Sequence, residues 1–379
     1  MEKTISTNQA SLILCIFTIA LKLSALPAIM FSYAGNDSYV TCLIALVFDF
    51  IGTVIIINIM HKHPNVTFFE MLKSTLGKVF AIIVHVILLL YFLIKCVLVL
   101  QELHDYFIAT LFEELNPIFF LLVLAGLMLY SASKNFRTIG RMLQLIFWPT
   151  FILIIFSLLF PIVDLQIEKL FPILEQGFFP IYRGLTRTTF AFGDYMILLP
   201  MMGHISFEKK SKKKMLLYMS SALSFILNFF IIFVGSFGDF SASQTLALSE
   251  LPLHNTTPAT IGKLEWLTIT IWTVILLIDA EILATACRNV FDNIFNTSGK
   301  NTGAIVVSIT VSSVVAFTYL QLTTIVEFVI SPAFATTVGM MQLLMVIVLI
   351  IANIVKNKSG KKLQNKSKMK MDKNRKLQC

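Results

Sequence analysis

Six ionisable side chains stand inside stretches of the sequence that are otherwise apolar. They are Lys22, Asp49, Lys95, Asp194, Asp279 and Glu281. A charged side chain at the centre of a membrane helix costs about 2.5 to 3.5 kcal/mol on insertion scales, so none of the six is expected to face lipid. We expect them to face one another or water, where they would bind the charged end of a zwitterionic ligand or take the place of a transported cation.

The most central of these charges belong to Lys22, Asp49 and Asp194, and Lys22 is predicted to pair with Asp194 or Asp279. Such a pair could bind a ligand, or it could be a fixed ion pair that only orders the helices. The sequence leaves both interpretations open. Lys95 lies nearer the end of its apolar stretch and is expected to extend its ammonium group toward the membrane surface.

Two of the acids are expected to play narrower parts. Asp279 and Glu281 are two positions apart, about 200° around a helix, so at most one of them can point into a site. Asp49 is predicted to hold its helix against the sixth or seventh helix of the chain and not to contact a ligand.

The elements that must position these residues are membrane helices. Hydrophobic residues make up 57% of the chain and charged residues only 13%, whereas soluble domains carry about 25% charged residues. Apolar stretches of roughly 20 residues recur along the sequence, and each can cross a hydrocarbon core of about 30 Å. We predict ten spans, at residues 10–34, 39–60, 79–101, 117–133, 142–162, 184–204, 215–237, 265–287, 303–321 and 329–355.

The distribution of Lys and Arg predicts the orientation. In a ten-helix chain, 24 of the 30 Lys and Arg residues fall on the side that carries both termini. Because cytoplasmic connections are rich in these residues, both termini are predicted to be cytoplasmic. Residues 356–379 hold nine Lys and one Arg against one Asp. They are predicted to form a basic disordered tail that contacts anionic lipid, and nucleic-acid binding is the less favoured alternative.

Ten helices divide into two sets of five, and the second set must then run with inverted topology. The predicted divisions are a cytoplasmic N-terminus at 1–9, a first repeat at 10–162, an outer connection at 163–183, a second repeat at 184–355 and the tail at 356–379. The first helix of each repeat is expected to be broken. ALKLSALPAI carries Pro27, and TTFAFGDYMILLP carries Gly193 and Pro200. Proline frees a backbone carbonyl and glycine lowers the cost of unwinding, although both also kink purely structural membrane helices.

The sequence contains no motif of enzyme chemistry. The six His residues form no i, i+4 pair beside a carboxylate, and the five Cys residues form no CxxC pair. Phosphate-binding glycine loops, nucleophile elbows and catalytic carboxylate pairs are also missing from the sequence. We therefore predict no catalytic residue, no metal and no cofactor.

Several segments, in order along about residues 8 to 350, resemble one family of bacterial membrane proteins. They include HPNVTFFEMLKSTLGKVFAIIVHVILLLYF, QELHDYFIATLFEELNP, GRMLQLIFWP, DLQIEKLFPILEQGFFPI, FAFGDYMILLP and IGKLEWLTITIW. These segments are similar to the endospore germination permeases, the B subunits of nutrient germinant receptors. That family lies within the amino acid/polyamine/organocation transporter superfamily.

The resemblance implies a protein of the inner spore membrane that forms a complex with a receptor A subunit and a lipoprotein C subunit. Within that complex it would recognise a small nutrient, often an amino acid, and start germination. The matching positions place ligand contacts at both breaks and on helices 3 and 8, that is at Lys22, Leu23, Ser24, Ala25, Leu26, Phe192, Gly193, Asp194, Lys95 and Asp279. Many relatives carry a small residue where this chain has Lys22, so its ligand or ion dependence is expected to differ.

Two functions remain open at the level of the sequence. The first is a ligand-sensing receptor subunit on a transporter-like fold. The second is an amino acid permease coupled to protons or sodium, with Lys22 or a carboxylate as the coupling group. Both need a site near the bilayer centre and two-state gating. A membrane enzyme is disfavoured, because no catalytic motif is present.

Overall fold

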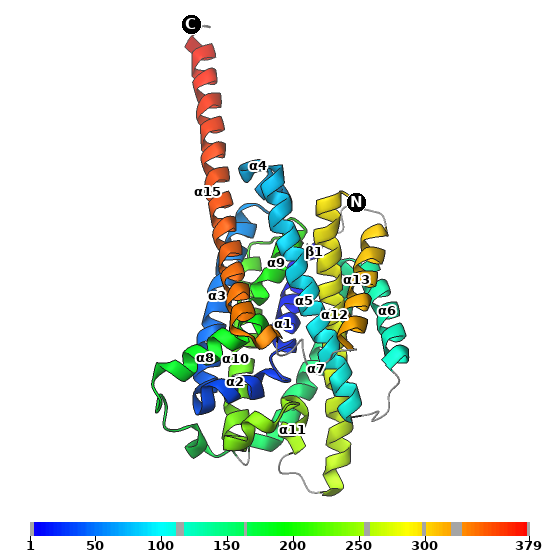
Figure 1. The fold of residues 1–379 in the computed structure, drawn as a ribbon. Helices are drawn as coiled ribbons and strands as arrows, with labels where there is room; N and C mark the ends of the chain where they lie inside the picture. Colours follow the sequence, from blue (N-terminus) through cyan, green and yellow to red (C-terminus); the bar gives the residue numbers. More distant parts are fainter. Residues whose placement is uncertain are drawn as a thin grey trace.

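The computed structural model describes residues 4–110, 117–162, 165–253, 258–297, 301–319 and 328–376, which form a bundle of α-helices (Figure 1). Both ends of the described chain lie at the same end of the bundle, called here the terminal end. The longer helices are α3 (Ser38–Lys62), α5 (Lys78–Thr110), α6 (Pro117–Ser133), α7 (Phe136–Ile162), α10 (Ser211–Phe237), α12 (Pro258–Phe295), α13 (Thr302–Tyr319) and α15 (Pro332–Lys376).

Shorter elements connect and interrupt these helices. The short α-helices are α1 (Thr7–Ala20), α2 (Leu26–Ala34), α4 (Phe68–Leu76), α8 (Phe178–Thr188), α9 (Leu198–Met201) and α11 (Ala247–Leu253). The 3-10 turns are η1 (Gly35–Asp37), η2 (Ile167–Leu170), η3 (Thr189–Ala191), η4 (Asp194–Ile197) and η5 (Gly238–Ser243). Strands β1 (Ile5–Ser6) and β2 (Ile205–Ser206) pair in parallel, and the pairing ties the N-terminal segment to the chain just after α9.

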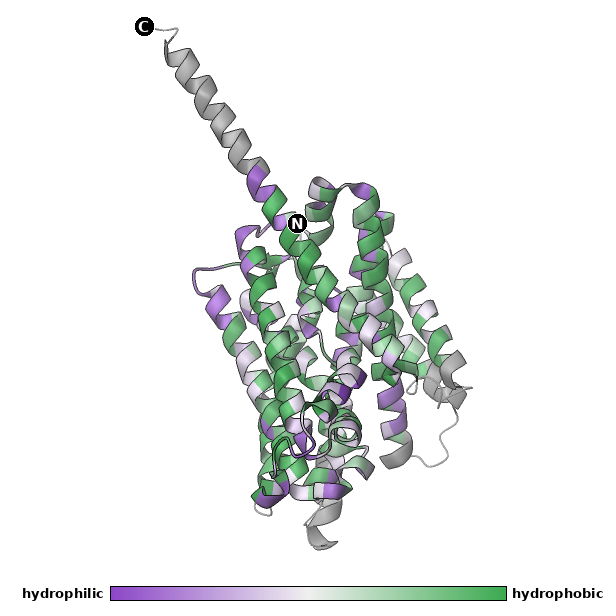
Figure 2. Ribbon diagram, turned by 60° about the vertical axis from the view of Figure 1, so that its left-hand side comes forward, coloured by the Kyte–Doolittle hydropathy of each residue, from purple (hydrophilic) through white to green (hydrophobic). Residues whose placement is uncertain are grey.

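Apolar helices long enough to cross a membrane make up most of the bundle (Figure 2). Among the described residues there are six, at Leu26–Lys62, Lys78–Phe107, Phe136–Phe156, Ser211–Ser243, Ile269–Phe295 and Pro332–Lys358. Three shorter apolar helices accompany them, at Thr7–Ala20, Val123–Ser133 and Thr302–Ala316. The prediction of an all-α, multi-pass membrane protein is confirmed. The count of ten crossings and the inverted repeat stay predictions.

Helix α1 lies at the centre of the bundle and packs against α7, α10 and α12. Every residue of α1 except Asn8 is buried, which is the pattern of a helix that is apolar on all sides. A capping box starts it, in which the Ser6 hydroxyl accepts from the Gln9 backbone N–H and the Gln9 side chain accepts from the Ser6 N–H. This central position puts the residues that follow α1 in the interior of the molecule.

Both predicted helix breaks are present. The first runs from Leu21 to Ala25, between α1 and α2, and Pro27 stands in the first turn of α2 where its missing N–H costs nothing. The second lies between η3 and η4 at Phe192 and Gly193, where Gly193 has a φ of +81°. We call these segments the first break and the second break.

Helix α15 continues from its apolar part into the basic segment and ends at Lys376. Lys, Gln and Met favour helix, and the segment after residue 356 contains no proline. The disordered tail at 356–379, whose last three residues lie outside the described ones, stays a prediction.

Candidate functional site

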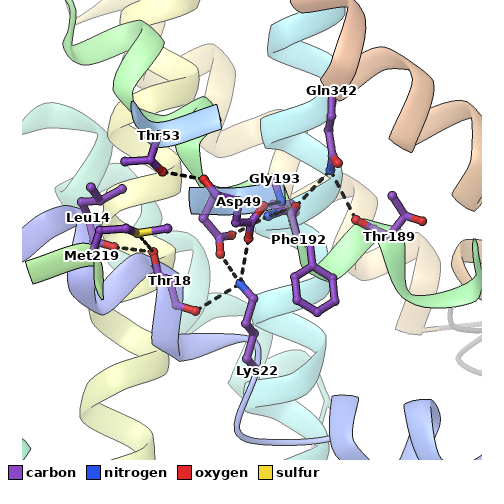
Figure 3. A network of polar contacts seen from close by, with 12 residues as sticks. Leu14, Thr18, Lys22, Asp49, Thr53, Thr189, Phe192, Gly193, Met219 and Gln342 are labelled. Atoms are coloured by element: carbon purple, nitrogen blue, oxygen red, sulfur yellow. Dashed lines mark hydrogen bonds and ion pairs between the residues drawn. The ribbon is translucent and has the colours of Figure 1, made fainter. Parts of the chain in front are cut away.

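An ion cluster joins the first break to the second (Figure 3). The ammonium of Lys22, which follows α1, forms an ion pair with the Asp194 carboxylate of η4, as predicted. It also donates to the Thr18 carbonyl at 3.2 Å and lies 3.8 Å from Asp49 Oδ2. All three charged side chains are buried. Two broken helices and α3 are thereby held together by charges that water does not reach.

Lys95 belongs to the same cluster, contrary to the expectation that it extends toward the membrane surface. It is 2% exposed, and its ammonium contacts Asp194 Oδ1 and the Phe192 carbonyl oxygen, both at 3.0 Å. A partner of opposite charge and a free carbonyl are available closer than the interface, so the side chain turns inward. Asp194 therefore bridges two lysines.

The second break is held by donors and acceptors from three helices. Asp49 on α3 accepts from the Gly193 N–H at 2.8 Å, which agrees with its predicted role of holding two helices together. The Phe192 carbonyl accepts from Lys95, from the Tyr91 hydroxyl at 3.2 Å and from Gln342 Nε2 at 3.0 Å. The backbone groups that unwinding exposes thus find side-chain partners, as they must in a non-aqueous interior.

Sequence reasoning missed Tyr91 and Gln342 as parts of this arrangement. Gln342 on α15 also donates to the Thr189 carbonyl at 3.3 Å, and both residues are buried. A Gln in the middle of an apolar helix was a usable signal, because a buried amide must find partners. Tyr91 gave no such signal, since tyrosine is common at apolar positions.

The first break faces a cavity of about 200 Å³. Its lining includes Leu21, Ser24, Ala25 and Leu26 of the first break and α2, together with Ile29, Leu98, Gln101, Glu102, Asp105, Phe190, Thr245, Leu246 and Val329. Glu102 Oε1 on α5 accepts from the Ala25 N–H at 3.2 Å. The predicted span ended at residue 101, whereas α5 continues past it and leaves Glu102 partly buried against the first break. The extra turns of α5, which reaches Thr110 and not residue 101, account for the difference.

Eight of the ten predicted ligand contacts fall into two groups. Ser24, Ala25 and Leu26 line the cavity. Lys22, Lys95, Phe192, Gly193 and Asp194 form the ion cluster and the second break. Leu23 belongs to the apolar core. Asp279 on α12 is fully buried, but it does not line the cavity and has no hydrogen-bond partner among the described residues.

A second, larger cavity of about 900 Å³ lies toward the terminal end, against β1 and the start of α7. Lys134, Arg137 and the ion-paired residues Arg288 and Asp292 are among its lining. No group of three or more His, Cys, Asp or Glu suited to a metal ion occurs in the described part of the chain. Neither cavity therefore has the ligand set of a metal centre.

Comparisons with known proteins agree with this architecture. A family-wide sequence model described as spore germination protein matches residues 4–325. The chain is also similar to the spore germination protein YndE of Bacillus subtilis (strain 168), with 24% identity over 236 residues, or 61% of this chain and 64% of that protein. The match thus spans a little under two thirds of the relative. The chain belongs to the spore germination protein family, the family that the sequence resemblance predicted.

Proposed function

We propose that this protein is the transporter-like B subunit of a spore nutrient germinant receptor and binds a small nutrient in the cavity at the first break. The observation that carries the proposal is the position of the cavity, which opens directly onto the unwound residues Ser24 and Ala25. In transporters built from inverted repeats, ligands bind where unwound backbone and half-helix ends line a cavity. The family supports the link to germination.

The chemistry of the cavity suits an amino acid. Its volume of about 200 Å³ equals the liquid volume of roughly seven waters at ~30 Å³ each, enough for a small zwitterion. Glu102 and Asp105 supply negative charge for an ammonium group, whereas Leu98 and Phe190 offer an apolar wall. The N-terminus of α2, which has no side-chain cap, presents the positive end of its dipole to a carboxylate.

Glu102 occupies the position that a ligand carboxylate would take, because it accepts from the Ala25 N–H. An arriving nutrient would replace this bond with its own carboxylate and leave Glu102 free to contact its ammonium group. In the empty site the Ala25 N–H is bonded to Glu102, and in the occupied site it would be bonded to the ligand carboxylate. Ligand binding would then change the position of α2 relative to α5.

The proposed setting is the inner membrane of the spore, with both termini in the cytoplasm. The Lys and Arg distribution supports this orientation, and both chain ends lie at the same end of the bundle (Figure 1). We further propose a complex with a receptor A subunit and a lipoprotein C subunit, which rests on the family alone.

The experiment is a binding titration with purified protein in lipid nanodiscs and a panel of single amino acids and sugars. Binding is read as a rise in the thermal unfolding midpoint. We expect at least one amino acid to bind, and Glu102→Gln to weaken that binding tenfold or more. Glu281→Gln is the matched control, because Glu281 is a partly buried acid that does not line the cavity; its binding should equal that of the wild type.

The proposal fails if no nutrient of the panel binds and spores with Glu102→Gln germinate normally on every nutrient. An ion-coupled amino acid permease is the second candidate, favoured by the buried Lys22–Asp194 ion pair between the two breaks. Uptake of a labelled amino acid into proteoliposomes distinguishes the two. A receptor binds without accumulation, whereas a permease accumulates the amino acid only under an ion gradient.

A further inference from the structure

Asp279 is the one carboxylate near the ion cluster, among the described residues, with neither oxygen in a hydrogen bond or an ion pair. Its exposed fraction is 0%, and both Oδ1 and Oδ2 are without a partner in the described part of the chain. Asp194, by contrast, contacts two lysines. Asp49 accepts from the Gly193 N–H and lies 3.8 Å from Lys22. A buried ionised carboxylate without a partner is strongly unfavourable.

The charges around Asp279 do not compensate a negative charge on it. The charges whose fields reach Asp279 are those of Lys95 and Glu102 on α5, Asp194 on η4 and Lys22 in the first break. The field of Asp279 in turn reaches the Cys96 thiol of α5. Both lysines are already engaged, Lys95 with Asp194 and Lys22 with Asp194 and Asp49. Asp49 and Asp194 therefore already balance Lys22 and Lys95 before Glu102 and Asp279 are counted. An ionised Asp279 would add a negative charge within the fields of Asp194 and Glu102.

We propose that Asp279 is a proton-binding site: its carboxyl group is neutral in this conformation and takes up or releases a proton when the second break moves. Protonation removes the negative charge that would otherwise need a hydrogen-bond or ion-pair partner. A neutral carboxyl group is far less costly to bury than a carboxylate. The site is distinct from the ligand cavity, which Asp279 does not line.

Lys95 connects this site to the second break. Its ammonium is held by Asp194 Oδ1 and the Phe192 carbonyl, and both acceptors belong to the second break. If the second break moves away from α5, Lys95 loses both acceptors, and Asp279, on which Lys95 acts more strongly than any other charge, becomes its carboxyl partner. The O–H bond of Asp279 then breaks, the proton passes to water, and a Lys95–Asp279 ion pair remains.

The direct test is infrared spectroscopy of the purified full-length protein in lipid nanodiscs at neutral pH, without any nutrient. A protonated carboxyl group gives a carbonyl-stretching band well separated from that of a carboxylate. We expect this band in the wild type and its loss in Asp279→Asn. Glu281→Gln, which changes an acid two positions away on the same helix, should keep the band at full intensity.

Labelling aspartate with ¹³C in the wild-type chain adds the residue type to the assignment, because the band must shift if it belongs to an Asp and stay in place if it belongs to Glu102. An unshifted band, or an unchanged band in folded Asp279→Asn protein, would overturn the proposal. So would a wild-type spectrum that shows only carboxylate, as an ionised Asp279 holding Na⁺ would give.

The link through Lys95 is tested by changing the charge count. Asp194→Asn leaves two lysines with Asp49 and Asp279, so Asp279 should ionise and its band should disappear at the same pH. The double variant Lys95→Met/Asp194→Asn removes one cation and one carboxylate together, which should restore the band. A band that persists in Asp194→Asn, or that stays absent in the double variant, would contradict the link.

Discussion

The two breaks arise at similar places in the predicted repeats but differ in how their backbone groups are satisfied. At the second break, side chains from α3, α5 and α15 bond to Phe192 and Gly193, and the Phe192 carbonyl alone accepts three hydrogen bonds. At the first break, one side chain, Glu102, bonds to the Ala25 N–H, and the unwound residues face a cavity. In this conformation the second break is the more heavily hydrogen-bonded junction, and the first is built to exchange a partner.

The two breaks therefore differ in how easily a ligand can replace their hydrogen bonds. A ligand can compete with a single carboxylate at the first break, whereas at the second it would have to replace several buried hydrogen bonds. Lys22 and Lys95 both pair with Asp194, so a change at the first break reaches the second through charge. Four variants test this difference between the two breaks. For each, the change in the free energy of unfolding is determined by titration with a denaturing detergent.

The largest effect is expected for Asp194→Asn, which removes the ion-pair partner of Lys95 and leaves Lys22 with Asp49 at 3.8 Å. Removing one partner from a buried ion pair costs about 3 to 5 kcal/mol. Asp105→Asn is the control, because the Asp105 side chain is 45% exposed. This variant should lower the free energy of unfolding by less than about 1 kcal/mol. Equal losses for the two variants would mean that the cluster does not hold the breaks together.

Gly193→Ala should lower the free energy of unfolding by about 2 to 4 kcal/mol. A left-handed backbone costs a non-glycine residue about 1 to 2 kcal/mol, and a Cβ at this position would lie 2.5 Å from Gln342 Cδ. Gln342 cannot move aside without losing its own hydrogen bonds. In Gly126→Ala, where a Cβ meets nothing within 4 Å, stability should be unchanged or slightly higher. A tolerated Gly193→Ala would contradict the close packing of Gln342 against the second break in this conformation.

Gln342→Ala removes two hydrogen bonds to the second break, those to the Phe192 and Thr189 carbonyls. Each such bond contributes about 1 kcal/mol, and Phe192 keeps its other donors, so the expected loss is about 1 to 2 kcal/mol. Gln342→Glu is an informative companion, because it keeps the shape but replaces the amide donor by an acceptor. A smaller loss for Gln342→Glu than for Gln342→Ala would show that packing, and not hydrogen bonding, carries the effect.

The smallest change in stability is expected for Glu102→Gln at the first break, within about 1 kcal/mol. The amide oxygen can still accept from the Ala25 N–H, so the bond that closes the empty site survives. The same variant should nevertheless weaken nutrient binding tenfold or more, since the negative charge is lost. A stability loss as large as that of Asp194→Asn would show that the two breaks are equally fixed.

Much of this architecture could be predicted from the sequence, because apolar stretches long enough to cross a membrane depend on composition alone. The two breaks were also predictable, since Pro27 and Gly193 act on the local backbone. The pairing of Lys22 with Asp194 or Asp279 followed from the high cost of leaving a charge in an apolar interior, and the structure shows Asp194 as the partner. Each of these features has a physical cause that lies within a short stretch of sequence or within one pair of charged residues.

Other features were decided only by the tertiary structure. Lys95 turns inward because Asp194 and the Phe192 carbonyl lie within its reach. Glu102 is partly buried against the first break because α5 extends further than its apolar stretch. Asp279 could be recognised as a buried acid, but not as one without a partner. Which side chains meet depends on how helices far apart in the sequence pack together. The sequence by itself therefore determined the helices, their breaks and the presence of buried charge, and the packing decided which charges are satisfied and which break is left facing a cavity.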